Sequence, residues 1–224
     1  MKFAILILIL SLTVQQPTIG QKQLTETEIL DSWTSQLRST TSKDFRNVSV
    51  DEKCNERINS ILDSLHENNI DSILIYTIAY PGYITSDRCF FGSYPIYSYI
   101  IWYLGNQLFI RSFKGGCETT SSNFDSIGLI DFYRRHYDSV FKETFMPVIF
   151  GATQTNEGKI SYSMKFLDHE PKYSIHIKSG NNFKILSFAE NDIRNEQSLF
   201  HRYNQRLNSY LLWELIKREV SNYR

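Results

Sequence analysis

Ile96–Leu104 (IYSYIIWYL) and Gln107–Phe113 (QLFIRSF) flank the dipeptide Gly105-Asn106, and this stretch decides the fold. Both segments are rich in β-branched and aromatic residues, which favour strands. A two-residue connection with glycine first is typical of a type II′ turn, whose twist suits an antiparallel pair. The stretch therefore predicts a β-hairpin.

A strand is also expected on the N-terminal side of this hairpin. Ile73–Tyr80 (ILIYTIAY) is a continuous apolar and aromatic run that ends at Pro81-Gly82. Such a run, bounded by turn residues, is typical of a strand covered on both faces. The segment from Pro81 to Pro95 then becomes a loop.

The second half of the chain repeats this plan. Ile160–Leu167 alternates in polarity, and Tyr173–Lys178 and Phe183–Ala189 flank the turn residues Ser179 to Asn182. Gly105 to Phe113 and Gly180 to Phe188 share five of nine residues. Two explanations are open: a duplicated unit, spanning 71–146 and 147–224, or the small choice of residues that strands and turns use.

Two helices are expected near the N-terminus, within residues 21–70. Thr25 and Glu28 have the spacing of a capping box, and a second helix is predicted from about Val50 to Asn68. Asn68-Asn69 is a suitable stop, because asparagine tolerates the left-handed conformation at a helix end.

Two further helices follow from apolar residues at helical spacing. One is predicted over Asn123–Phe145 with Ser122 or Asn123 as its cap, and a long one runs from about Asp192 to the C-terminus. The fold class is therefore α+β: about six antiparallel strands with an N-terminal helical pair, a middle amphipathic helix and a long C-terminal helix, the strands and later helices forming one region over 71–224.

The first twenty residues resemble a secretory signal peptide. Lys2 precedes the apolar run Phe3–Leu12, and Thr18 to Gly20 offer small side chains for cleavage before Gln21. The run is too short to span a bilayer. We expect a secreted or periplasmic protein with no membrane span after cleavage.

The charge balance disfavours nucleic-acid binding. The full chain carries 24 basic and 24 acidic residues, and loss of Lys2 with the signal leaves 23 against 24, a net charge of −1. Nucleic-acid-binding domains normally carry a basic excess. Asn47-Val48-Ser49 is a glycosylation acceptor by pattern, or Ser49 simply caps the second helix.

Three cysteines enter an oxidising compartment, so one pair and one remaining thiol are expected. Cys89 and Cys117 lie in polar connections that contain glycine, and we predict that they form a disulfide. Cys54 shares the apolar face of the second helix with Ile58 and Leu62, so it is predicted to be a buried thiol.

Patterns for catalysis and cofactors are weak. None of the five histidines has metal-ligand spacing, and the chain contains no nucleophile elbow, dinucleotide fingerprint or P-loop. No cofactor and no metal site are therefore predicted. Asp168-His169-Glu170 offers one imidazole and two carboxylates, and it is the centre of the alternative that the chain is a small hydrolase or metal-dependent enzyme.

The tyrosine-rich stretch is the best candidate for binding. Tyr94, Tyr97 and Tyr99 surround the start of the hairpin, and tyrosine offers a flat apolar face with a polar tip. We predict a non-enzymatic binding or interaction module that uses these residues, or the loop from Pro81 to Pro95, to bind an unknown ligand or protein partner. A third alternative is a structural envelope protein that forms oligomers through its C-terminal helix.

Overall fold

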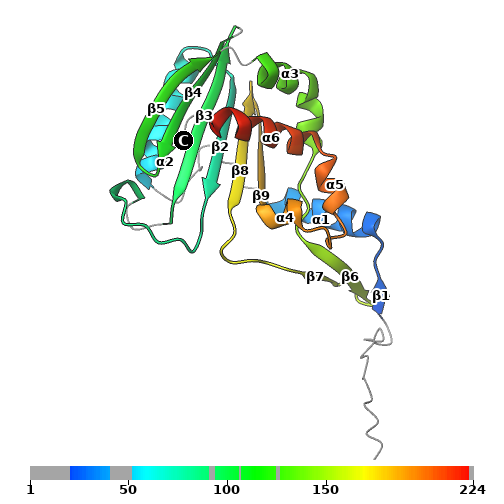
Figure 1. The fold of residues 1–224 in the computed structure, drawn as a ribbon. Coiled ribbons are helices and arrows are strands. Elements are labelled where there is room, and N and C mark those ends of the chain that lie inside the picture. The colour runs from blue at the N-terminus through cyan, green and yellow to red at the C-terminus, as the bar shows by residue number, and fades with distance from the viewer. Residues whose placement is uncertain (1–20, 41–51, 91–93, 106, 125–126, 222–224) are drawn as a thin grey trace, which may run out of the picture.

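Two antiparallel sheets organise the chain. The computed structural model describes residues 21–40, 52–90, 94–105, 107–124 and 127–221 (Figure 1). The signal peptide, the glycosylation acceptor at Asn47 and the cap at Ser49 lie outside these ranges.

The large sheet has six strands in the order β5-β4-β3-β2-β8-β9. Its strands are β2 (Ser72–Ala79), β3 (Ile96–Leu104), β4 (Gln107–Lys114), β5 (Cys117–Phe124), β8 (Lys172–Ser179) and β9 (Asn182–Ala189). β3 and β2 are the two central strands, and six consecutive residues of β2 are buried. This matches the expected strand covered on both faces.

The small sheet has the order β1-β6-β7, formed by β1 (Gln21–Gln23), β6 (Ile149–Thr155) and β7 (Ile160–Met164). Helix α1 (Glu26–Thr40) packs on it through Ile29, which is fully buried with Met146 and Ile149. The strands of the first predicted unit, β2 to β5, all lie in the large sheet. The strands of the second predicted unit are divided: β6 and β7 lie in the small sheet, and β8 and β9 lie in the large one.

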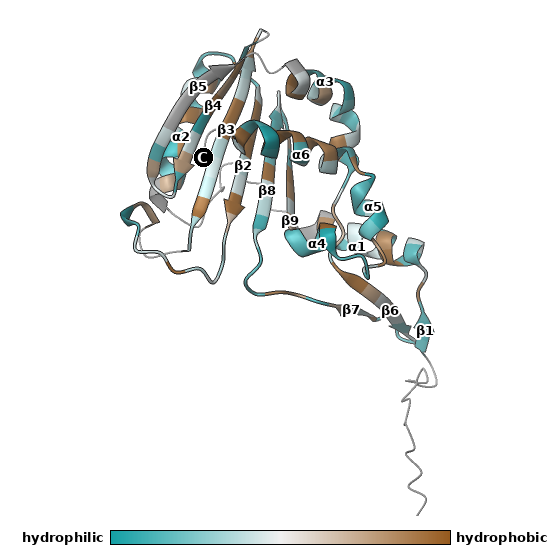
Figure 2. Cartoon of the chain, in the orientation of Figure 1, coloured by the Kyte–Doolittle hydropathy of each residue, from teal (hydrophilic) through white to brown (hydrophobic). Residues whose placement is uncertain are grey.

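Helices cover both faces of the large sheet. α2 (Glu52–Glu67) packs Cys54, Ile58 and Leu62 against Ile73 and Ile75. The other face carries α3 (Ile127–Lys142) and α6 (Asn208–Ser221), so that α2 lies behind the sheet and α6 in front in Figure 1. Figure 2 shows that the hydrophobic residues follow the strands, while α4 (Glu190–Arg194) and α5 (His201–Gln205) are mostly hydrophilic.

Several local predictions are confirmed. The Thr25 amide donates to the Glu28 carboxylate at 2.9 Å, and the Glu28 amide donates to the Thr25 hydroxyl at 3.3 Å. Asn69 adopts φ +58° just after α2. Cys89 and Cys117 form the disulfide, and Cys54 is fully buried outside it.

The segment after β4 differs from the prediction. Ser122 and Asn123 lie in β5 and do not cap a helix, and α3 begins at Ile127. Gly115-Gly116 connects β4 and β5 as a two-residue turn, with Gly115 at φ +54°. β5 is polar because it is an edge strand that pairs with β4 alone, so its sequence lacks the apolar pattern of a central strand.

β6 was not predicted, and β7 ends at Met164 rather than at Leu167. Gly151 and a register irregularity interrupt β6, so its sequence lacks the regular alternation of polar and apolar residues that identifies a strand. The Lys165 amide donates to the Val148 carbonyl at 3.3 Å, and the chain then leaves the sheet. The residues Lys165 to Pro171 form a loop.

The segment expected as one long helix from about Asp192 is divided into α4, α5 and α6. Side chains between α4 and α5 bond to nearby backbone: the Gln197 amide donates to Asn195 Oδ1 at 3.0 Å, and the Phe200 amide donates to Ser198 Oγ at 3.3 Å. Such local bonds compete with helical ones. Apolar spacing alone did not reveal the interruption.

Candidate ligand-binding site

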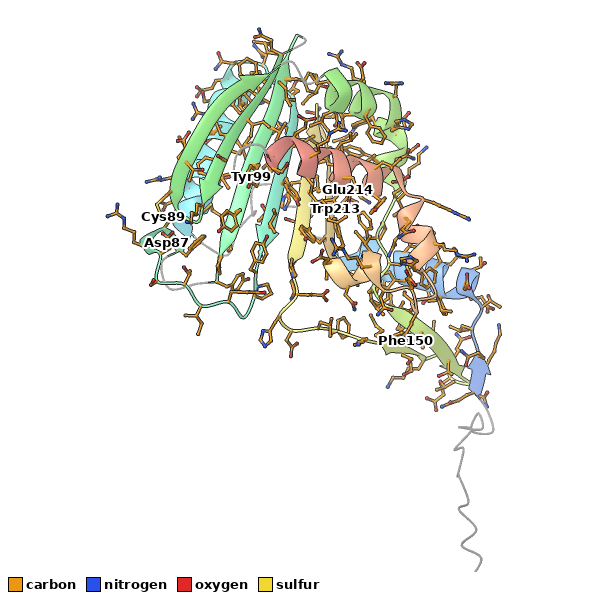
Figure 3. The ribbon with its side chains drawn as sticks, in the orientation of Figure 1. Asp87, Cys89, Tyr99, Phe150, Trp213 and Glu214 are labelled. Atoms are coloured by element: carbon orange, nitrogen blue, oxygen red, sulfur yellow. A yellow bond between two sulfur atoms is a disulfide. The ribbon has the colours of Figure 1, made fainter. Side chains whose placement is uncertain are left out.

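Tyr97 and Tyr99 lie on one face of the large sheet because side chains two apart on a strand point the same way. This is the face that carries α6, and the register places Tyr97 beside Lys114 and Tyr99 beside Ser112. Figure 3 labels Tyr99 on β3 and Trp213 on α6. Both side chains belong to the core on the face of the sheet opposite α2. Ser112 Oγ lies 2.9 Å from Thr119 Oγ1 of β5.

A tight turn brings two more tyrosines to these residues. The Tyr83 amide donates to the Tyr80 carbonyl at 3.3 Å across Pro81 and Gly82. Gly82 has φ +82°, and proline followed by such a glycine is the signature of a type II turn. The rings of Tyr80 and Tyr83 meet edge to face at 5.9 Å, and those of Tyr80 and Tyr97 at 6.0 Å.

Together these side chains line a pocket of about 490 Å³, which we call the tyrosine pocket. Its lining consists of Tyr80, Tyr83, Pro95, Tyr97, Tyr99, Ser112, Phe113, Lys114 and Thr119. Tyr99 is buried, whereas Tyr83 is 58 % exposed. The pocket thus has a fixed aromatic floor and an exposed tyrosine at its rim.

The loop that carries Tyr80 and Tyr83 is fastened to the β4–β5 turn. The disulfide joins Cys89 to Cys117 with their Cα atoms 5.4 Å apart, and the Gly116 amide donates to the Cys89 carbonyl at 2.8 Å. A Cβ at Gly115 would overlap the same carbonyl, so glycine is required there for close approach. The wall of the pocket is therefore held by covalent and backbone contacts.

The cation at the pocket is balanced by a neighbouring anion. Lys114 Nζ lies 2.6 Å from Asp87 Oδ2, and Asp87 Oδ1 accepts the Cys89 amide at 3.0 Å. The hydrogen bond from Lys114 lowers the pKa of Asp87, and the same bond raises the pKa of Lys114. Both groups are therefore charged near neutral pH, and their opposite charges balance each other beside the tyrosine pocket.

The three tyrosines predicted as a binding set are divided between two places. Tyr97 and Tyr99 line the tyrosine pocket, whereas Tyr94 lines a second pocket of about 500 Å³ on the face that carries α2. Tyr94 precedes β3, so strand alternation does not apply to it. The loop from Pro81 to Pro95 contributes Tyr83 and Pro95 to the tyrosine pocket.

The Asp168-His169-Glu170 segment lies between β7 and β8, and the structure places the His169 side chain apart from the two carboxylates. Asp168 and Glu170 line the second pocket, and Glu170 Oε2 accepts the Asn191 amide at 2.6 Å. The His169 ring packs against Gly82. Within the described ranges, no group of three or more histidine, cysteine or acidic side chains is arranged to hold a metal ion.

Ser112, Lys114 and Thr119 were missed by the sequence reasoning. The pairing of Leu104 with Gln107 sets the register of β3 and β4, which places Ser112 and Lys114 beside the tyrosines. Gly115-Gly116 is itself a hairpin signal that brings Thr119 alongside. The strand registers set by the two short turns would therefore have predicted that these three residues lie beside the tyrosines.

No family model, curated protein or solved structure matches this chain. Over the part of the chain that the structure describes, no helix is both long and apolar enough to cross a bilayer. The functional argument therefore depends on the geometry of this protein itself.

Proposed function

We propose that this protein is a non-enzymatic binding module, and that the tyrosine pocket holds an uncharged small molecule with a flat apolar surface. One observation carries the proposal: Tyr97 and Tyr99 of β3 meet Tyr80 and Tyr83 of the adjoining loop around a cavity of about 490 Å³. Small-molecule sites are typically concave, mainly apolar and about 300–1,000 Å³ in volume.

The ligand class follows from the lining. The tyrosine rings offer apolar faces, and their hydroxyls join those of Ser112 and Thr119 as donors and acceptors. The charge of Lys114 is balanced by Asp87. A ring-shaped neutral compound with a few hydroxyl or carbonyl groups fits this lining.

We also propose that the protein acts outside the cytoplasm. The N-terminal sequence supports export, and the Cys89–Cys117 disulfide is compatible with an oxidising compartment. The alternative of oligomerisation through the C-terminal helix has less support, because Leu212, Trp213 and Ile216 of α6 are buried in this chain's own core. Among the large apolar residues of α6, Leu211 is 46 % exposed, so the helix offers little apolar surface for contact with a second copy.

Binding is tested by saturation-transfer NMR of residues 21–224 with a library of uncharged aromatic and cyclic compounds. We expect hits whose affinity falls at least about fivefold in Tyr83→Ala, since one aromatic contact is worth roughly 1 kcal/mol. Phe166→Ala is the matched control, because Phe166 is an even more exposed aromatic residue in another loop, outside the tyrosine pocket. A library without hits, or hits indifferent to Tyr83→Ala, contradicts the proposal.

A further inference from the structure

A row of hydroxyl groups crosses the opposite face of the large sheet. Ser98 of β3 pairs with Thr77 of β2, Thr77 pairs with Ser174 of β8, and Ser174 pairs with Ser187 of β9. Residues paired across neighbouring strands lie on the same face, so the four hydroxyls form one line. Thr77 Oγ1 and Ser98 Oγ are 3.3 Å apart.

This row runs from the core to the surface. Ser98 and Thr77 are buried, Ser174 is half-buried and Ser187 is exposed. Thr77, Ser174 and Ser187 line the second pocket, of about 500 Å³, which we call the hydroxyl pocket. Three strands thus supply a flat polar floor that combines donors and acceptors.

Charged side chains of both signs surround this floor. The carboxylates of Asp168, Glu170 and Asp192 line the hydroxyl pocket together with Lys165 and Lys172. The three acidic and two basic groups leave the lining close to neutral, with a small negative excess. A phosphate or other anionic ligand is therefore disfavoured, whereas a neutral ligand with many hydroxyls finds both acceptors and donors.

Two of the carboxylates are held in place by backbone amides. Asp192 Oδ1 accepts the Val148 amide at 3.2 Å, and Asp192 Oδ2 accepts the Ala189 amide at 2.8 Å. Glu170 Oε2 accepts the Asn191 amide at 2.6 Å. Each carboxylate has about four acceptor sites, so these bonds orient the groups and leave acceptor capacity for a ligand.

The loop from Lys165 to Pro171 adds an apolar side to the pocket. Phe166 is 73 % exposed and Leu167 is 40 % exposed, and both line the pocket with Tyr94. A large apolar side chain exposed to this degree beside a polar floor is typical of a site that receives a ligand with one apolar face.

We propose that the hydroxyl pocket is a carbohydrate-binding site. A pyranose ring carries several hydroxyls around its edge and an apolar C–H face. The edge hydroxyls pair with the row of Thr77, Ser174 and Ser187 and with the oriented carboxylates, and the apolar face packs on Phe166. This site is independent of the tyrosine pocket, since the sheet separates the two.

The test uses residues 21–224 and saturation-transfer NMR with glucose, galactose, mannose, N-acetylglucosamine and their β-linked disaccharides as probes. We expect at least one of them to bind. Ser187→Ala should weaken its binding about three- to tenfold, in line with one lost hydrogen bond, and Phe166→Ala should weaken it at least as much. Both residues are exposed, so both variants are expected to keep the wild-type melting temperature.

Tyr83→Ala is the control, because it alters the tyrosine pocket and leaves the hydroxyl pocket intact. Saccharide binding that is unchanged in Tyr83→Ala supports the proposal. The proposal is overturned if none of the probe saccharides binds, or if binding is indifferent to Ser187→Ala and Phe166→Ala. Saccharide binding lost only in Tyr83→Ala also overturns it, and assigns the sugar to the tyrosine pocket.

Discussion

Gly82 lies so close to the imidazole ring of His169 that a Cβ at position 82 would overlap Nδ1 of that ring. The contact joins the loop that carries Tyr83 to the loop that carries Phe166. These loops border the tyrosine pocket and the hydroxyl pocket, respectively. The two loops therefore touch at this point, although the pockets that they border share no lining residue.

Gly82→Ala is expected to destabilise the protein more than Gly158→Ala. Both glycines have φ +82°, but no atom lies within 4 Å of a Cβ at Gly158. The shared backbone strain costs about 1–2 kcal/mol, and the overlap with His169 adds about 1–3 kcal/mol for Gly82→Ala. Urea denaturation measures both values. His169→Ala in the Gly82→Ala background should recover part of the difference, and equal costs for the two glycine variants would refute the steric argument.

Loss of the disulfide should weaken both stability and ligand binding. The double substitution Cys89→Ser with Cys117→Ser is expected to lower the free energy of unfolding by about 3–4 kcal/mol, from the 28-residue separation that the bond closes. Because the bond fastens the loop of Tyr83, affinity at the tyrosine pocket should fall too. Dithiothreitol should destabilise the wild type and leave the double variant unchanged; equal sensitivity of the two proteins would contradict the prediction.

Glu143 should stabilise the protein in a pH-dependent way. Its carboxylate accepts the Asn208 amide at 3.0 Å and the Ser209 amide at 2.6 Å, both at the start of α6. Burial alone would raise the pKa of Glu143, but these hydrogen bonds outweigh burial, so the pKa lies below its ordinary value of 4.5. A lowered pKa gives stability that is complete above pH 4.5 and is lost as the pH falls through the lower value.

Glu143→Gln is accordingly expected to cost about 1–2 kcal/mol at pH 7. The cost should shrink progressively below pH 4.5, which urea denaturation at a series of pH values measures. Glu157→Gln, in the exposed β6–β7 turn, is the control with little expected effect. A cost for Glu143→Gln that stays constant from pH 7 to pH 3 would rule out this role of the carboxylate.

Asn204→Ala should be among the more damaging polar substitutions. Asn204 is fully buried; its Oδ1 accepts the Met146 amide at 2.9 Å, and its Nδ2 donates to the carbonyls of Met146 at 2.7 Å and Asp192 at 2.8 Å. Removing the side chain leaves these backbone groups unpaired, at a cost of about 2–4 kcal/mol. Asn156→Ala, exposed in the β6–β7 turn, should stay within about 0.5 kcal/mol of wild type in thermal unfolding. Similar melting temperatures for the two variants would disprove this role.

Export predicts a defined N-terminus. Intact mass and N-terminal peptides of the protein from its own host should show a chain that begins at Gln21, with one disulfide and one thiol. Peptides that retain Met1 to Gly20 in the mature protein would disprove cleavage. The same spectrum reports whether Asn47 carries a glycan.

The sequence by itself determined the elements whose signals are local. Gly105-Asn106 and its apolar flanks specified the β3–β4 hairpin, Thr25 with Glu28 specified the start of α1, and Asn69 specified the end of α2. Turn chemistry and capping act within a few residues, so they can be read from the chain alone. The disulfide followed from cysteine number and the polar surroundings of Cys89 and Cys117.

Only the tertiary structure decided which distant segments meet. Tyr97 and Tyr99 were predicted together with Tyr94, but the sheet separates Tyr94 from them, and the partners of the pair come from Tyr83 and the β4–β5 turn. Likewise, Asn204 of α5 binds Met146, which lies in the segment between α3 and β6. Pairing between strands and packing between loops depend on contacts far apart in sequence, and local periodicity carries no information about them.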